Sequence, residues 1–136
     1  MKWKPFYTLD HVKKFVGDGL DADGLTHLDI SLEDRVLVLI RMLYDIKGKD
    51  AVVSFAGNCA LRAYYNGTAY DCYAAIAASE TSYAASAFYC TKNAICAANC
   101  AADLTDATSV YPGVSYVTER QWQIDYLVAA INENHM

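Results

Sequence analysis

The sequence contains no long, strongly hydrophobic run. Residues 1–5 are not followed by seven or more consecutive apolar residues, so no secretory signal is predicted and we expect a cytoplasmic protein. The most apolar stretch, residues 83–102, is rich in alanine and is interrupted by Lys92, Asn93 and Asn99. Such a stretch is too weakly hydrophobic to predict a membrane span. We therefore expect it in a protein core, without membrane contact.

Basic residues are outnumbered by acidic ones. The chain has 11 lysines and arginines against 16 aspartates and glutamates, which gives a net charge of −5. Nucleic-acid binders need clustered basic side chains for their phosphate contacts. This balance argues against a general nucleic-acid binder, and a partner that is recognised by charge is expected to be a basic protein.

The five cysteines fit neither a disulfide framework nor a standard metal motif. Their number is odd, and without a secretory signal we expect reduced thiols. Cys96 and Cys100 are spaced to share one helix face as a metal-binding pair could, but zinc needs two more ligands. The available candidates are Cys59, Cys72, His11, His27 and His135. Because no second closely spaced pair exists, buried apolar thiols are the favoured interpretation, with no metal or cofactor.

No pattern in the sequence predicts catalysis. A reactive thiol needs a helix N-terminus or cationic neighbours that lower its pKa. The cationic neighbour that the sequence offers to a cysteine is Lys92, two residues after Cys90. A catalytic thiol beside His11 or His27 is formally possible, but no local feature of the sequence would activate it. We therefore predict a protein that is not an enzyme and has no catalytic residues.

Alanine dominates the middle of the chain. Eighteen of the 58 residues from Ala51 to Thr108 are alanine, and all five cysteines and many of the tyrosines lie among them. Alanine has the highest helix propensity, and its small side chain lets helix axes approach closely. With 136 residues, of which 54% are hydrophobic, the chain is expected to form one domain over residues 1–136.

The predicted fold class is all-α, a compact single-domain bundle of about six helices with an alanine-rich central helix. Ser31 and an acidic residue at position 34 form a capping signal, and Asn66-Gly67 is a strong turn. The valine and leucine run after residue 35 could also form a buried strand, but its length favours a helix. The expected helices cover residues 9–16, 32–46, 51–65, 69–78, 83–103 and 118–131, with an acidic loop over about 17–31 and a connector over about 104–117.

Several local features carry more detailed expectations. Asp50 is expected to cap the third helix, and Thr68 the fourth. Residues 79–82, Ser-Glu-Thr-Ser, are expected to break the helix that precedes them. Gly57 is expected to mark a close helix crossing, and Thr118 to cap the last helix.

Polar residues in the alanine-rich tract are sparse. Those that point inward are expected to pair with one another, because a buried polar group needs a hydrogen-bond partner. The residues in question are Arg62, Glu80, Lys92, Asn93, Asn99 and Asp103.

The N-terminal quarter is acidic and could steer a basic partner toward the protein. Residues 21–24, Asp-Ala-Asp-Gly, resemble the middle of a calcium loop, but Gly19 and Ile30 occupy positions where ligands belong, so no calcium site is predicted. The alternative is that this charge only keeps the protein soluble. The candidate partner-binding residues are Asp18, Asp21, Asp23, Asp29, Glu33 and Asp34.

Four stretches resemble an alanine-rich family of bacterial immunity proteins of the immunity-protein-5-like kind. They are residues 32–41, the cysteine-bearing residues 55–62, the alanine run 83–102 and the closing residues 119–127. The resemblance implies an all-helical protein that neutralises a toxin by binding it, without cofactor or catalytic residues. The tract departs from the family in its many tyrosines, cysteines and serines.

The leading functional hypothesis is therefore a non-enzymatic inhibitor that sequesters or blocks a partner protein. One alternative is a virus-encoded inhibitor of a host protein, because fold class alone does not distinguish the two. Another is a self-assembling helical module in which an alanine and tyrosine face forms a symmetric homodimer.

Overall fold

The computed structural model describes residues 31–68, 70–103 and 116–133, and within these ranges it contains five α-helices and no strand. The all-α fold class is confirmed for this part of the chain. The helix expected at residues 9–16 and the acidic loop up to residue 30 lie outside it. The helices are α3 (Leu32–Lys47), α4 (Lys49–Tyr65), α5 (Asp71–Tyr83), α6 (Ala87–Ala102) and α7 (Tyr116–Asn132).

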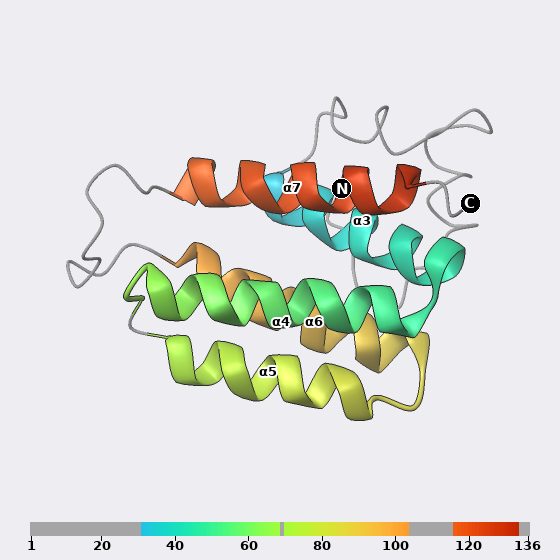
Figure 1. The fold of residues 1–136 in the computed structure, drawn as a ribbon, viewed down its shortest axis with the longest axis horizontal. Helices are drawn as coiled ribbons and strands as arrows, with labels where there is room; N and C mark the ends of the chain where they lie inside the picture. The colour runs from blue at the N-terminus through green and yellow to red at the C-terminus, as the bar shows by residue number, and fades with distance from the viewer. Residues whose placement is uncertain (1–30, 69, 104–115, 134–136) are drawn as a thin grey trace.

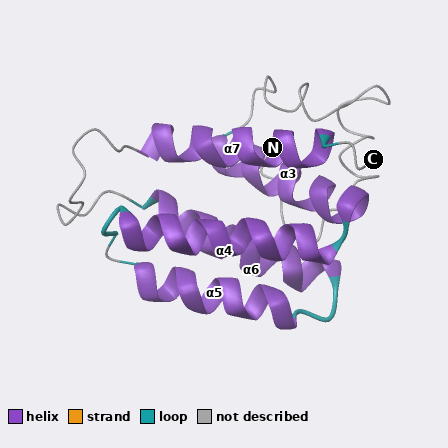
Figure 2. Cartoon of the chain, viewed as in Figure 1, coloured by secondary structure: helices purple, strands orange, loops and turns teal. Residues whose placement is uncertain are grey.

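The helices stack in three tiers (Figure 1). The first tier is α5 alone, the second is α4 with α6, and the third is α3 with α7. The alanine-rich helix α6 contacts each of the other four helices, whereas α5 contacts only α4 and α6. Short loops join the consecutive helices α3 to α6 (Figure 2). None of the described helices is both long enough and apolar enough to cross a membrane.

Helix α3 confirms the helical interpretation of the valine and leucine run. The Ser31 Oγ accepts a hydrogen bond from the backbone N–H of Asp34 at 3.1 Å, which is the expected cap. Side chains on most of its circumference are buried, so the helix has no purely solvent-facing stripe. The buried apolar residues are Val36, Leu37, Val38, Leu39, Ile40, Met42 and Leu43.

A single glycine separates α3 from α4. Gly48 has a φ of 91°, and its N–H donates to the carbonyl oxygen of Tyr44 at 2.9 Å, so it ends α3 and also precedes the first residue of α4. The expectation that Asp50 caps this helix is therefore wrong. Asp50 lies inside the first turn, where its negative charge still complements the helix dipole.

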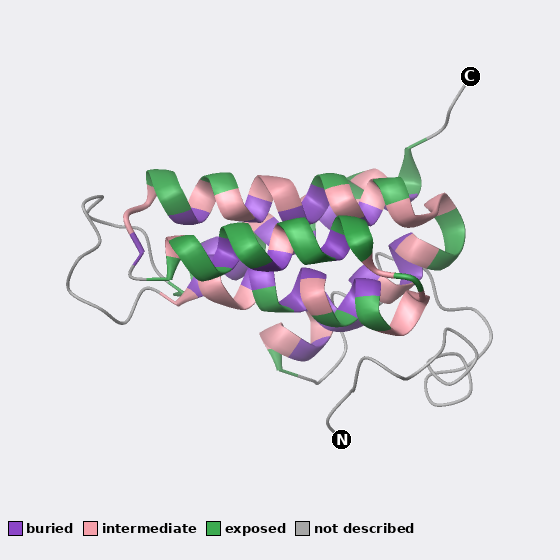
Figure 3. Cartoon of the chain, turned by 90° about the horizontal axis from the view of Figure 1, so that it is seen from below, coloured by how far each residue is buried: buried purple, intermediate pink, exposed green. Residues whose placement is uncertain are grey.

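Helix α6 packs through its small residues. Its buried side chains are mostly those of alanine, and they allow close contact with neighbours on several sides. In the bundle as a whole, buried residues lie on the inner faces of the helices and exposed residues on the outer faces (Figure 3). Thr91, Ile95, Ala98 and Ala102 are buried and lie at three- and four-residue spacings along the helix. The alanine tract therefore forms the centre of the bundle, as its composition predicts.

The break between α5 and α6 lies later than predicted. Residues 79–82 are helical, and the break falls at residues 84–86. The last residue of the break, Ser86, caps α6. The helix accommodates residues 79–82 because Thr81 is buried against its neighbours and two of the hydroxyls find backbone acceptors within the helix. Thr81 donates to the carbonyl oxygen of Ala77 at 2.8 Å, and Ser82 to that of Ser79 at 2.6 Å.

Three smaller expectations are also corrected. A Cβ atom added to Gly57 would meet nothing within 4 Å, so this glycine does not mark a close crossing. The residue that caps α5 is Tyr70, not Thr68, and its side chain makes no capping hydrogen bond. Helix α7 begins at Tyr116, so Thr118 lies inside it and the connector is shorter than predicted.

Candidate functional site

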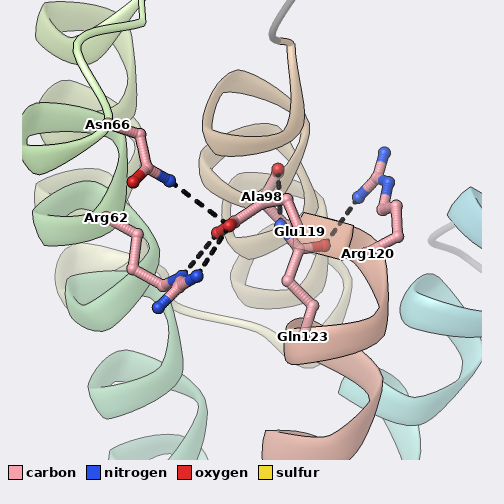
Figure 4. Close-up of polar contacts among 6 residues, drawn as sticks. All are labelled: Arg62, Asn66, Ala98, Glu119, Arg120 and Gln123. Carbon is pink, nitrogen blue, oxygen red and sulfur yellow. Dashed lines mark hydrogen bonds and ion pairs between the residues drawn. The ribbon is translucent and has the colours of Figure 1, made fainter. Parts of the chain in front are cut away.

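A fully buried carboxylate joins α7 to α4. The Glu119 oxygens accept hydrogen bonds from Arg62 Nε at 2.7 Å and Arg62 Nη2 at 2.8 Å, and Asn66 Nδ2 adds a third at 3.3 Å (Figure 4). This two-pronged geometry is the strong form of the arginine–carboxylate pair. Because both Glu119 oxygens accept hydrogen bonds, the pair fastens two helices and leaves no open acid or base.

The outer side of the same pair reaches the surface. Arg62 is about a third exposed, and its guanidinium carbon stacks over the Trp122 ring at 4.1 Å from the ring centre. One helical turn further along α7, Tyr126 accepts a hydrogen bond from Asn58 at 3.3 Å. The contact between α4 and α7 therefore consists largely of long polar and aromatic side chains.

The neighbouring residue, Arg120, is also buried, and its guanidinium reaches α6. One guanidinium nitrogen donates to Gln123 Oε1 at 2.9 Å, and the other terminal nitrogen donates to Asn99 Oδ1. Gln123 in turn donates to the carbonyl oxygen of Ala98 at 2.9 Å (Figure 4). The guanidinium also stacks on the Tyr116 ring at 5.2 Å. These contacts bind α7 to α6.

The sequence contains a signal for this buried network that the cap interpretation of residues 118–121 missed. The buried apolar residues of α7, Ile124, Leu127 and Ile131, lie at helical spacing. Extended toward the N-terminus, the same stripe passes through Arg120 and Gln123. Polar residues in register with an apolar stripe indicate a buried network that a partner helix must satisfy.

The sparse polar residues of the alanine tract only partly follow the prediction. Arg62 and Asn99 do point inward, but they bond to Glu119 and Arg120 of α7 and not to one another. Glu80 and Lys92 are exposed. The partners come from a helix distant in the sequence, which composition could not indicate.

The five cysteines are all free thiols. The expectation of buried thiols is correct for Cys59 and Cys90 but wrong for Cys72 and Cys96, which are exposed, and Cys100 is partly buried. Burial is the main cause that raises the pKa of Cys59, Cys90, Cys96 and Cys100, and at Cys59 the charge of Glu119 raises it further. Within the described ranges, no group of three or more histidine, cysteine or acidic residues is placed to hold a metal ion. The histidine candidates lie outside these ranges.

Two of the six proposed partner-binding residues can be placed. Asp34 is only 6% exposed, so little of it is available to a partner. Glu33 is partly buried and accepts a hydrogen bond from Asn99 Nδ2 at 3.4 Å. The other four, Asp18, Asp21, Asp23 and Asp29, lie outside the described residues.

Large aromatic and aliphatic side chains are exposed on the end of α4 and along α5, and we call this set the tyrosine surface. It comprises Leu61, Tyr64, Tyr65, Tyr70, Tyr73, Ile76 and Tyr83. On α5 the spacing of residues 73, 76 and 83 places three of them on one helix face, away from the buried Ala74 and Thr81. The tyrosine surface is thus carried by the outermost helix of the bundle and by its neighbour (Figure 1).

Two pockets lie next to α7. One, of about 380 Å³, lies between the start of α4 and the end of α7, where Lys47, Asp50 and Tyr126 form part of the wall. The other, of about 270 Å³, is lined by Arg120 together with residues of α3, α6 and α7.

Comparisons with protein-family models, curated proteins and solved structures found no match for this chain. Function is therefore argued from the residues and their geometry.

Proposed function

We propose that this protein is a non-enzymatic inhibitor that binds a partner protein and blocks it, in the manner of an immunity or toxin-neutralising protein. The observation that carries the proposal is the tyrosine surface. Tyr73, Ile76 and Tyr83 are 63%, 55% and 83% exposed. Exposed large apolar side chains that gather on one helix face are typical of protein interaction sites.

Tyrosine suits such a site for a physical reason. Its ring contributes a large apolar contact area with few torsions to immobilise, and its hydroxyl remains available for hydrogen bonds. Tyrosine is accordingly enriched among the residues that dominate binding energy at interfaces. On α5 these rings project from a helix whose inner face, with Ala74 and Ala77, is buried against α4 and α6. The helix therefore presents them from a firmly packed support.

The charge of this region supports a basic or neutral partner. Helix α5 carries Asp71 and Glu80 and no basic residue. The whole chain has a net charge of −5. A basic partner would be attracted over distance and would then bury the tyrosine side chains on contact.

The state of the thiols supports a role without covalent catalysis. The nucleophile in thiol chemistry is the thiolate, and a raised pKa makes it scarce at neutral pH. Burial raises the pKa of Cys59, Cys90, Cys96 and Cys100. Cys59 and Cys90, which are buried, are better suited to packing than to reaction.

A second candidate function is self-assembly through the same surface. The favouring observation is that the exposed stripe of α5 contains a single charge, Glu80, among apolar side chains. Two copies could therefore bring their α5 helices together with little charge repulsion in a two-fold symmetric dimer.

The test compares the tagged wild-type chain with a triple variant and a double control variant in its native host cells. In the first, Tyr73→Ser, Ile76→Ser and Tyr83→Ser remove the stripe on α5. The matched control carries Ile46→Ser and Val117→Ser, which change exposed apolar residues on α3 and α7. We expect a stoichiometric protein to co-purify with the wild type and the control and to be lost from the stripe variant.

Sedimentation of the purified chain separates the two candidates. A monomer that captures a partner supports inhibition, and a dimer that the stripe substitutions dissociate supports self-assembly. Equal capture by the stripe variant and the wild type would overturn the proposed surface.

A further inference from the structure

Arg120 is a buried cation without a charged partner among the described residues. Its side chain is 1% exposed, and its printed hydrogen bonds go to the neutral amides of Gln123 and Asn99. Its Nε–H has no hydrogen-bond partner. Buried charges are costly unless they are paired, and an unsatisfied buried donor in a native structure calls for an explanation.

A pocket adjoins this guanidinium. Arg120 forms part of its wall together with Asn99, Ala102, Tyr116 and two acidic residues, Glu33 and Asp103. The volume, about 270 Å³, would hold about nine water molecules at about 30 Å³ each. The pocket therefore has room for a molecule the size of an amino acid.

A carboxylate lies close to the guanidinium along this wall. Glu33 Oε1 accepts from Asn99 Nδ2 at 3.4 Å, while Asn99 Oδ1 accepts from Arg120. One amide group thus spans the gap between a cation and an anion. The head group of an α-amino acid, in which one carbon separates an ammonium from a carboxylate, has the same polarity and a comparable span.

We propose that this pocket binds a free α-amino acid or a similarly small zwitterion, with its carboxylate at Arg120 and its ammonium at Glu33. A simple anion would be repelled by Glu33 and Asp103, and a simple cation by Arg120. A zwitterion satisfies both signs of charge and provides the carboxylate that Arg120 lacks. Ala102 and Tyr116 leave an apolar and aromatic wall for the ligand side chain. This site is separate from the tyrosine surface and does not depend on the proposed inhibitory function.

The test is an NMR titration of the full chain with the standard α-amino acids, one at a time. The signals to follow are the side-chain amide groups of Asn99 and Gln123, which bond directly to Arg120. We expect at least one amino acid to shift both signals with saturation. Its amide and its N-acetyl derivative, each of which lacks one of the two charges, should bind about tenfold more weakly.

Two variants keep the proposal testable without touching the buried arginine. Glu33→Gln removes the ammonium partner, and Asn99→Asp places a carboxylate where it competes with that of the ligand. Each should weaken binding about tenfold, whereas the exposed control Glu80→Gln should leave it unchanged. The proposal is overturned if no amino acid gives saturable shifts. It is also overturned if the amide and N-acetyl derivatives bind the wild-type protein as tightly as the amino acid does, or if the Glu33→Gln variant binds the amino acid as tightly as the wild type does.

Discussion

Arg62 and Glu119, 57 residues apart in the sequence, form a two-pronged ion pair with N···O distances of 2.7 and 2.8 Å. The carboxylate is fully buried, whereas the guanidinium is partly exposed and stacks on Trp122. Four helices of the bundle come from the continuous segment that ends at residue 103, and α7 follows after the connector. This pair is therefore one of the contacts that hold the last helix to the others.

Replacing Glu119 by glutamine should destabilise the fold. The change leaves the buried end of the Arg62 guanidinium without its counter-charge, and we expect a loss of about 2–4 kcal/mol, slightly below the range for a fully buried pair because Arg62 is partly exposed. Urea unfolding followed by circular dichroism measures the loss. The matched control is Asp125→Asn, which changes an exposed carboxylate on the same helix that is bonded to Gln121. Equal stabilities of the two variants would contradict the structural role of the ion pair.

Alanine substitution of Gly48, which precedes α4, and of Gly57, which lies inside α4, should change the stability of the protein in opposite directions. Gly57 is helical and has open space around an added Cβ, so Gly57→Ala should stabilise the protein by about 0.5–1 kcal/mol. Gly48 has a φ of 91°, which an alanine adopts only with strain, so Gly48→Ala should destabilise it by about 1 kcal/mol or more. Thermal unfolding of the two variants tests the signs. A stabilised Gly48→Ala would show that the backbone there differs from the structure described.

Stability should fall at alkaline pH because of Cys59. Burial raises the pKa of this thiol far above its ordinary value of 9.0, so the folded state holds the proton that the unfolded state releases. The contribution of the protonated Cys59 thiol to the free energy of unfolding is complete below pH 9. It is lost above that pH, at about 1.4 kcal/mol for each pH unit. Urea unfolding between pH 8 and about 10.5 measures the slope for the wild type and for Cys59→Ala. The variant should show a slope smaller by about this amount, and parallel curves would refute the assignment.

The alanines of α6 should not tolerate larger side chains. Ala94 is completely buried, so Ala94→Leu forces the helices apart and should cost about 1–3 kcal/mol or more. Ala75 is exposed on α5, and Ala75→Leu should change the free energy of unfolding by less than about 0.5 kcal/mol. Denaturant unfolding of both variants provides the comparison. If both leucines were tolerated equally, α6 could not be the packed centre of the bundle.

Local signals in the sequence located most of the described helices. Ser31 caps α3 as predicted, and the Asn66-Gly67 turn follows the end of α4. The errors occurred where a short-range rule competed with packing. Residues 79–82 were expected to break a helix, yet Thr81 is buried and its hydroxyl is satisfied inside the helix.

The candidate sites were less predictable than the helices. Glu119 and Arg120 were interpreted as part of a helix start, because their burial depends on Arg62 and Asn99 from other helices. Gln123, which bonds to the Ala98 carbonyl oxygen, was not singled out in the sequence. The tyrosines were noted in the sequence, where a position at a core margin is the commoner interpretation, but Tyr73 and Tyr83 lie on an open surface. Exposure became known only once α5 was seen to contact α4 and α6 alone among the described helices.

The amino-acid sequence by itself determined the helical class, the cap of α3 and the alanine-rich centre, because helix propensity, caps and apolar periodicity act between residues a few positions apart. The tertiary structure alone decided that Glu119 pairs with Arg62, that Arg120 lies beside a pocket with Glu33, and that the tyrosines of α5 face outward. These relationships join helices far apart in the chain, and they depend on how the small side chains of α6 let those helices pack around it.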